Sequence, residues 1–95
     1  MKQRKKLYVV AYDLQDDRNR NKVAKLLERY GVRVNFSVFE CLFTEKQLQR
    51  LLERIEKLMD KKTDRIIFYP ICLNCYVGII RQPNWKTNMA QVDIV

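Results

Sequence analysis

The sequence predicts an α+β fold of the ferredoxin-like class, a βαββαβ sandwich with an antiparallel sheet and an appended fifth strand. Two observations predict it. Apolar β-rich runs and two amphipathic helical segments follow one another in that order, and each helix has one apolar stripe that can cover a sheet. The 95 residues suit one domain. We expect residues 1–80 to form this ferredoxin-like domain and residues 81–95 to form a C-terminal tail. The tail is either disordered or docks through Trp85–Val95 on a partner subunit or the integrase.

The first strand, residues 7–12, is apolar on both faces. Its side chains should alternate, with Leu7, Val9 and Ala11 on one face and Tyr8, Val10 and Tyr12 on the other. A strand that is covered on one side only alternates with polar residues, so this strand should be central and covered twice. Because most small homo-oligomers are isologous dimers, a second copy of the chain is the simplest second cover, and we expect a homodimer.

The first helix should begin after Asp16 or Asp17, since either carboxylate can cap it. Gly31 is the expected C′ residue at its end. Spacings of three and four define an apolar stripe of Val23, Leu26, Leu27 and Tyr30. The opposite side carries a basic stripe of Arg18, Lys22, Lys25 and Arg29. This basic stripe is either a nucleic-acid contact or a solvated helix face.

Two short strands should follow between Val32 and Phe43. The apolar alternation changes phase at Asn35–Ser37, which predicts a bulge or a tight turn there. Thr44 and Gln47 then form a capping box that starts a second helix. Its apolar stripe is Leu48, Leu51, Leu52, Ile55, Leu58 and Met59, and its charged face mixes signs and should be solvated.

The last two strands are expected over residues 65–72 and 75–80. Pro70 cannot donate to a ladder, which places the first of them at a sheet edge or a bulge. Asn74 should turn the chain into the second, the appended fifth strand.

The composition favours a polyanionic partner. The chain has 19 Lys and Arg against 11 Asp and Glu, a net charge of +8. No apolar run approaches the roughly 20 residues that cross a membrane. The basic start runs into Asp13, Asp16 and Asp17 without a small-residue cleavage site. We therefore expect a cytoplasmic protein without membrane association.

The three cysteines, Cys41, Cys72 and Cys75, are expected to be buried structural thiols. Their odd number argues against a disulfide framework. The CxxC of Cys72 and Cys75 supplies only half of a zinc site, and a redox role would require it to open a helix. The chain has no histidine, so catalysis would have to use carboxylate, metal or hydroxyl chemistry.

From Tyr8 to about Ile80 the chain resembles the CRISPR-associated protein two family, the small partner of the integrase in CRISPR spacer acquisition. The resemblance rests on three segments in order: Tyr12-Asp13-Leu14 followed by Asp16-Asp17, the helix from Arg20 to Leu27, and Tyr30-Gly31-x-Arg33-Val34-x-x-Ser37-Val38-Phe39-Glu40. It implies a ferredoxin-like homodimer, a divalent-metal-dependent endonuclease that cleaves RNA or DNA, and a scaffold that binds duplex DNA between integrase dimers.

The resemblance also implies site residues. Asp13 matches the metal-binding aspartate of the family, and Arg20, Arg33, Ser37 and Phe39 match positions associated with cleavage or its geometry. Two positions depart from the family pattern. Lys22 replaces a common arginine and loses its bidentate fork, and Asn35 replaces a usual glutamine, whose longer arm it lacks.

A metal at Asp13 would be Mg²⁺ or Mn²⁺. Mg²⁺ keeps most of its waters and needs one or two protein carboxylates. A two-fold axis near Asp13 would place two copies of this carboxylate on one ion. The ion could then polarise a phosphodiester and activate a water, while Arg20 and Arg33 hold phosphate oxygens. The alternative for Asp13 is a loop or cap residue.

Two other functions fit the same topology. An RNA-binding module would stack bases on Tyr8, Tyr12, Phe39 and Phe43 of an open sheet face, although the glycine-containing signature of such modules is missing. A ribonuclease toxin of the same fold and size is the other.

Overall fold

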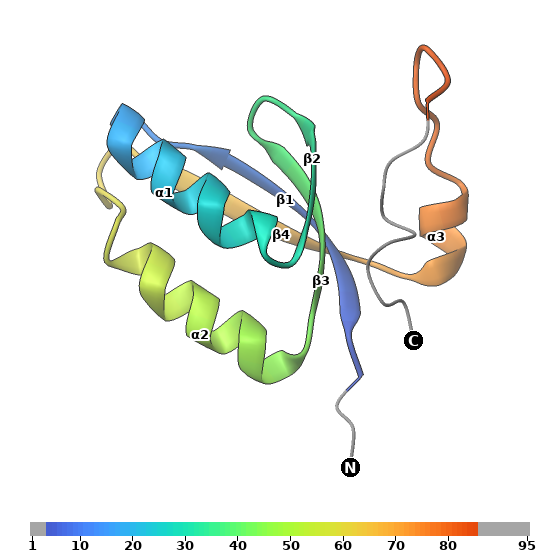
Figure 1. The fold of residues 1–95 in the computed structure, drawn as a ribbon, viewed down its shortest axis with the longest axis horizontal. Coiled ribbons are helices and arrows are strands. Elements are labelled where there is room, and N and C mark those ends of the chain that lie inside the picture. Colours follow the sequence, from blue (N-terminus) through green and yellow to red (C-terminus); the bar gives the residue numbers. More distant parts are fainter. Residues whose placement is uncertain (1–3, 86–95) are drawn as a thin grey trace.

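The computed structural model describes residues 4–85 as a four-stranded antiparallel sheet with helices on both faces (Figure 1). In chain order the elements are β1 (Lys6–Asp13), α1 (Asp17–Glu28), β2 (Gly31–Asn35), β3 (Val38–Phe43), α2 (Glu45–Glu56), β4 (Arg65–Ile71) and α3 (Leu73–Val77). The strand order β2-β3-β1-β4 makes β1 central, as predicted. α1 and α2 cover one face, which confirms the ferredoxin-like α+β sandwich.

The face of the sheet under α1 and α2, called here the helix face, holds the hydrophobic core. In the register of β1 and β3, Val10 lies opposite Phe39, and both side chains are fully buried. The core consists of Val10, Tyr12, Leu14, Val23, Ala24, Leu27, Phe39, Cys41, Phe43, Leu51 and Ile55. It contains even-numbered residues of β1 and members of both predicted helix stripes, so the helix face follows from the hydrophobic periodicity.

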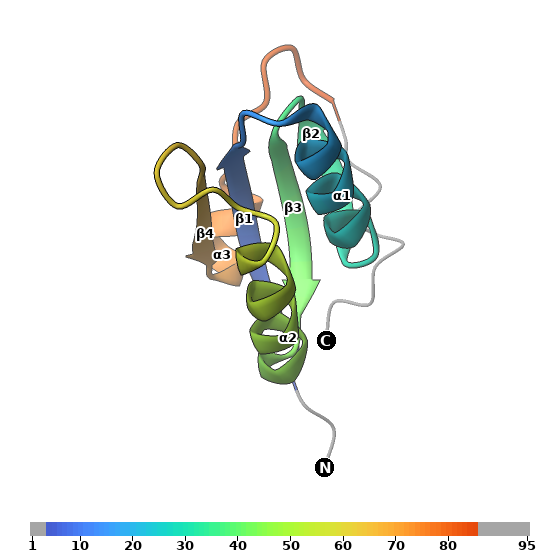
Figure 2. The ribbon, with the colours of Figure 1, turned by 90° about the vertical axis from the view of Figure 1, so that its left-hand side faces the viewer.

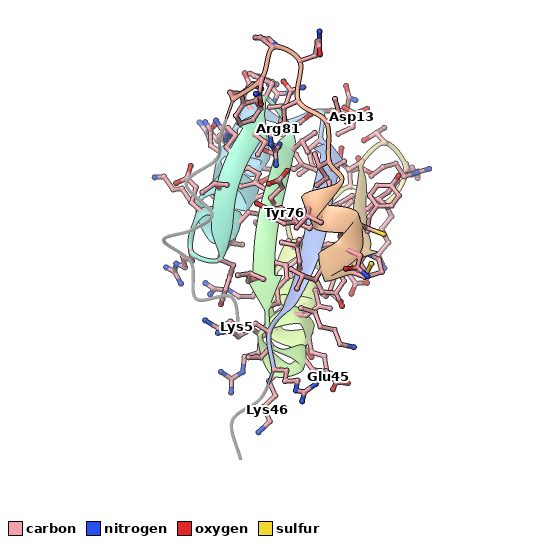
Figure 3. All side chains as sticks on the ribbon, turned by 90° about the vertical axis from the view of Figure 1, so that its right-hand side faces the viewer. Lys5, Asp13, Glu45, Lys46, Tyr76 and Arg81 are labelled. Carbon is pink, nitrogen blue, oxygen red and sulfur yellow. The ribbon has the colours of Figure 1, made fainter. Side chains whose placement is uncertain are left out.

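The opposite face, called here the second face, is covered in part by the chain itself. Figure 3 shows α3 and the segment after it in front of the sheet, with Tyr76 and Arg81 over its strands. Arg81 Nη2 donates to both carboxylate oxygens of Glu40, at 2.9 and 2.8 Å, and Glu40 is only 3% exposed. Arg81 also stacks on Trp85, 4.8 Å from the ring centroid. The predicted docking of the tail otherwise falls on residues 86–95, outside the described residues.

This cover is incomplete. On β4, Ile67 and Tyr69 are each 48% exposed on the second face, beside Ala11 and Val9 in the register. The two-sided apolar character of β1 therefore has two causes in the structure: the core under the helices and a second face that α3 covers only partly.

The predicted fifth strand over residues 75–80 is wrong. Cys72 caps a short helix, α3, instead, and its Sγ accepts the backbone N–H of Cys75 at 3.2 Å. A short apolar run does not by itself distinguish a strand from a helix, and here the local cap decides. Pro70 does lie in an edge strand, β4, as expected.

Gly31 is not the C′ residue of α1, because Arg29 ends the helix and Gly31 begins β2 without a positive φ. A Cβ on Gly31 would overlap the backbone of Glu40 and Cys41 on β3. The position therefore needs glycine for the close approach of two strands rather than for a helix end.

Most of the other local predictions are confirmed. Asp16 caps α1 by accepting the N–H groups of Arg18 and Asn19, and Thr44 and Gln47 form the capping box of α2. The chain turns at Phe36 and Ser37, within the predicted range, and the register of β2 and β3 shifts just before this turn, between Arg33 and Asn35. Leu52, placed in the apolar stripe of α2, is 42% exposed. Within residues 4–85, no helix has both the length and the apolarity to span a membrane.

A buried carboxylate, Asp64, fixes the connection that follows β1. Its side chain accepts the backbone N–H of Asp60 at 2.8 Å and that of Gln15 at 3.0 Å, and also the Thr63 hydroxyl. The hydrogen bonds from Asp60 and Gln15 hold the pKa of Asp64 below its usual value. Asp64 thereby ties the start of β4 to the loop between Asp13 and α1.

We predict that Asp64→Asn lowers the melting temperature by several degrees at pH 7, because an amide nitrogen would face backbone N–H donors. Since the folded pKa is lowered, the stabilisation by Asp64 is complete above the unfolded value of 3.8 and is lost as the pH falls through the folded pKa. The difference between wild type and variant should therefore shrink below about pH 4. Thermal unfolding from pH 7 to pH 2 measures it, with the exposed Glu53→Gln on α2 as control. A constant difference at all pH values would contradict the role of Asp64.

Candidate nucleic-acid interface

Asp13 lies exposed at the end of β1, as the sequence predicts. The register places it on the second face, opposite Arg65 of β4. Figure 3 shows it at one end of the sheet, with Lys5 and Glu45 at the other. The neighbouring acids do not share its position: Asp16 is the helix cap and Asp17 pairs with Arg20. Asp13 is therefore the exposed carboxylate at this strand end that the local structure does not use.

Arg20 lies close to Asp13 but is engaged with the loop between them. Its Nη1 donates to the carbonyl oxygens of Leu14 at 2.9 Å and of Gln15 at 3.4 Å, and its Nη2 pairs with Asp17. These bonds fix the first turn of α1 against the end of β1. In this conformation Arg20 positions the loop, and only the donors left over could reach a phosphate.

Three further predicted residues lie near the same end of the sheet: Arg33 on β2, Ser37 in the turn after it and Phe39 on β3. The carbonyl oxygen of Ser37 accepts the N–H of Tyr12 at 3.0 Å, so Ser37 is adjacent to the end of β1. The Arg33 guanidinium covers the ring of Phe39 at 5.2 Å. Phe39 is fully buried, so it can support Arg33 but does not present a surface to a substrate.

The structure therefore gathers the five predicted residues at one end of the sheet but divides them between its faces. Asp13 is on the second face, whereas Arg33 and Phe39 are paired in register with Val10 on the helix face. On the second face of one chain, Asp13 therefore has neither Arg20 nor Arg33 beside it. The arginine opposite Asp13 in the strand register is Arg65 on β4.

The donor set at Asp13 fits a hard divalent ion only in part. Among residues 4–85 there is no cluster of three or more Asp, Glu, Cys or His side chains that could hold a metal. Mg²⁺ accepts one or two carboxylates with water completing its shell, so a single Asp13 is sufficient chemically but weak. A second copy of Asp13 would supply the second carboxylate.

The basic stripe of α1 is exposed, as predicted, and it borders a groove. Lys22, Lys25 and Arg29 line a hollow of about 390 Å³ between α1 and α2, which lie next to each other over the sheet (Figure 2). Leu26 and Leu58 are the two apolar residues of its lining. Arg18, one turn before Lys22, continues the row toward the start of the helix.

The groove has two further cations that the sequence reasoning missed. Arg54 near the end of α2 and Lys57 just after it line the same hollow, which we call the interhelix groove. Its lining contains five cations and no carboxylate. The alternating signs on α2 predict a face that is merely solvated. Their three-residue spacing predicts that Arg54 and Lys57 lie on the same side of the helix. Only the packing of α2 against α1 shows that this side faces the basic stripe.

The aromatic residues considered for base stacking do not lie on an open face. Phe39 and Phe43 are at most 1% exposed and Tyr12 is 6% exposed, all beneath the helices. Tyr8 packs on the same core through Phe43 and Phe68. The predicted stacking surface for RNA is therefore absent among these residues.

Comparison with known sequences identifies one family. Residues 6–79 match the family described as CRISPR associated protein Cas2. A CRISPR-associated endoribonuclease Cas2 4 from Rhodospirillum rubrum is 48% identical over 68 residues, which are 72% of this chain and 55% of that protein. This chain therefore spans little more than half of that relative. A CRISPR-associated endonuclease Cas2 2 from Thermus thermophilus is 48% identical over 67 residues, covering 70% and 74% of the two chains.

Solved structures agree. The Cas2 crystal structure from Streptococcus pyogenes superposes with a TM-score of 0.73 at 32% identity, over 79% of this chain and 96% of that one. A chain in a structure called a partial Cas6-RT-Cas1–Cas2 complex gives a TM-score of 0.65 at 32% identity, over 80% and 89%. In both cases most of the fold is shared together with about a third of the sequence.

Proposed function

This chain belongs to the CRISPR-associated Cas2 family, and we propose that it acts as a homodimeric scaffold that binds duplex DNA with the integrase during spacer integration. The observation that carries this proposal is the interhelix groove, in which five cations and no acid line one hollow. The Cas1–Cas2 complex among the similar structures supports an integrase as partner. A nuclease function at Asp13 is the second candidate, supported by the names of the relatives.

The groove suits a phosphate backbone rather than a particular base sequence. Lysine and arginine at five points can neutralise several phosphates, and such contacts are independent of sequence and sensitive to salt. The other two lining residues, Leu26 and Leu58, are apolar, so no carboxylate of the groove would repel a phosphate. Arg18 extends the row beyond the groove, as a duplex that passes along α1 would require.

We predict that Arg54→Ala combined with Lys57→Ala reduces the salt dependence of duplex binding. The slope of log K against log[salt] should fall by about 0.9 for each phosphate that the variant no longer neutralises. Fluorescence anisotropy with a short duplex at several salt concentrations measures it. The matched control removes the same two charges from the exposed part of α2 outside the groove, as Lys46→Ala with Arg50→Ala. If both pairs lower the slope equally, the duplex binds somewhere other than the groove.

Homodimerisation would use the exposed part of the second face. Ile67 and Tyr69 of β4 are half exposed and on the same face as Asp13. A two-fold axis near this end of the sheet would bury them and bring the two Asp13 carboxylates together. A Mg²⁺ or Mn²⁺ site with two carboxylates requires this arrangement, since a single chain supplies only one Asp13 carboxylate.

We expect Ile67→Lys to convert the dimer to a monomer, because a charge would be buried without a partner in the interface. Analytical ultracentrifugation gives the mass directly. Leu52→Lys is the control, since Leu52 is exposed to a similar extent on α2, away from the second face. A dimer that survives Ile67→Lys would place the interface elsewhere.

For the nuclease, the chemistry divides between the ion and the chain. A divalent ion at the paired Asp13 carboxylates would supply an activated water and polarise the scissile phosphate. The chain would hold the ion through Asp13 and orient the loop through Arg20, whereas Arg33 lies on the other face of the sheet, stacked on Phe39.

We predict that Asp13→Asn abolishes metal-dependent cleavage of RNA or DNA and leaves the dimer intact, because the amide cannot provide a carboxylate ligand. Gel assays with and without Mg²⁺, together with ultracentrifugation, separate the two effects. Glu45→Gln removes the same charge at the opposite end of the molecule and should cleave normally (Figure 3). Cleavage by Asp13→Asn at the wild-type rate would show that the activity lies elsewhere or in a contaminant.

A further inference from the structure

The CxxC motif is not built as the sequence suggests. The sequence predicts buried structural thiols at Cys72 and Cys75, but both are exposed, and only Cys41 is buried. A redox role requires such a motif to open a helix, and the apolar runs around this one predict strands. In the structure Cys72 is the N-cap of α3, so the motif does open a helix.

The backbone holds the two cysteines in one tight turn. The N–H of Cys75 donates to Cys72 Sγ at 3.2 Å, and the N–H of Tyr76 donates to the carbonyl oxygen of Cys72 at 2.9 Å. The sulfur of Cys72 therefore already lies beside residue 75. A bond between the two sulfurs would need rotation of side chains and little movement of the backbone, which is the main geometric requirement for a disulfide.

The two thiols differ chemically. A hydrogen bond from the Cys75 thiol, aided by the backbone N–H of Cys75, lowers the pKa of Cys72. The same side-chain hydrogen bond and the charge on Cys72 raise the pKa of Cys75. Cys72 is thus the better thiolate and Cys75 the thiol that remains protonated. Cys41 cannot compete, since burial, followed by the charge of Glu40, raises its pKa to about 12.

Cys72 also lines a groove of about 590 Å³ that is suited to a small ligand. Leu7, Leu42 and Tyr76 contribute apolar walls, and Lys5 lines the groove beside them; Lys6 also borders it, although its place in the strand alternation is on the helix face. Figure 3 shows Lys5 and Tyr76 on this side of the sheet. The groove therefore combines a reactive thiol, an apolar wall and positive charge, a set that favours an anionic sulfur compound.

We propose that Cys72 and Cys75 form a reversible disulfide by exchange with an anionic low-molecular-weight disulfide of the glutathione class that binds in this groove. The proposal is independent of DNA binding and of Asp13. It concerns the end of β4 that is remote from Asp13 in the strand register.

The exchange has two steps. The Cys72 thiolate attacks one sulfur of the small disulfide, a mixed disulfide forms, and the first small thiolate leaves and takes up a proton from solvent. Cys75 then loses its proton to solvent and attacks Cys72 Sγ, which releases the second small thiolate. Two protein thiols are oxidised to one disulfide, and one small disulfide is reduced to two thiols. The exposure of the bond makes it accessible to the reverse reaction.

The test uses the full chain in buffers with different ratios of oxidised to reduced glutathione, followed by acid quenching, alkylation and mass spectrometry. The wild type should form a disulfide between Cys72 and Cys75, which reduced glutathione reverses, while Cys41 remains a thiol. Cys75→Ser should accumulate glutathione on Cys72, and Cys72→Ser should acquire it on Cys75 severalfold more slowly, because Cys75 does not line the groove and lacks the backbone N–H donor that Cys72 has. Wild-type thiols that persist in oxidised glutathione, or equal rates in the two variants, would overturn the proposal.

The groove is tested with two disulfides of different charge. Lys5→Ala combined with Lys6→Ala should slow the reaction with oxidised glutathione severalfold and leave the reaction with neutral hydroxyethyl disulfide unchanged. Lys61→Ala with Lys62→Ala removes the same charge beyond the other end of β4 and is the control. A decrease that is equal for both disulfides, or equal in the control, would exclude recognition of the anion by this groove.

Discussion

The central position of β1 is the constraint on which the rest of the structure depends. It pairs with β3 on one side and β4 on the other, and its side chains are apolar on both faces, so both faces need a cover. The helix face is covered by α1 and α2 with a core of apolar side chains. On the second face the cover includes a buried ion pair of Glu40 with Arg81, and removal of one partner from such a pair costs roughly 3–5 kcal/mol. The C-terminal segment is therefore held to the sheet by charge as well as by apolar contact.

The same strand sets the position of the candidate site. β1 ends at Asp13, and the chain must turn at once to place α1 over the helix face. Asp64 and Arg20 stabilise this turn from two sides, one through a backbone N–H group and the other through carbonyl oxygens. These hydrogen bonds satisfy backbone groups of residues 14 and 15 and do not involve the carboxylate of Asp13. A carboxylate of this kind, at the end of a rigid strand, is well placed to bind a ligand.

The sequence predicts most of this architecture because hydrophobic periodicity and caps act locally. The Asp16 cap, the capping box of Thr44 and Gln47 and most of both helix stripes are confirmed for this reason. The failures depend on contacts between distant segments. Gly31 is required by the backbone of β3, and Arg54 becomes part of a basic groove only when α2 packs on α1. The fifth strand is wrong because a cysteine, an uncommon cap, begins a helix where the apolar run resembles a strand.

The sheet also separates two candidate sites that the sequence places in one stretch of chain. The interhelix groove lies between α1 and α2, which cover the helix face, whereas Asp13 lies on the second face. A duplex held in the groove is thus divided from the carboxylate by the core of the molecule. If the groove binds DNA and a second copy completes the site at Asp13, the two functions use different surfaces and different oligomeric requirements. Binding would then persist without the carboxylate, and the groove can serve a scaffold whether or not the strand end cleaves a phosphodiester.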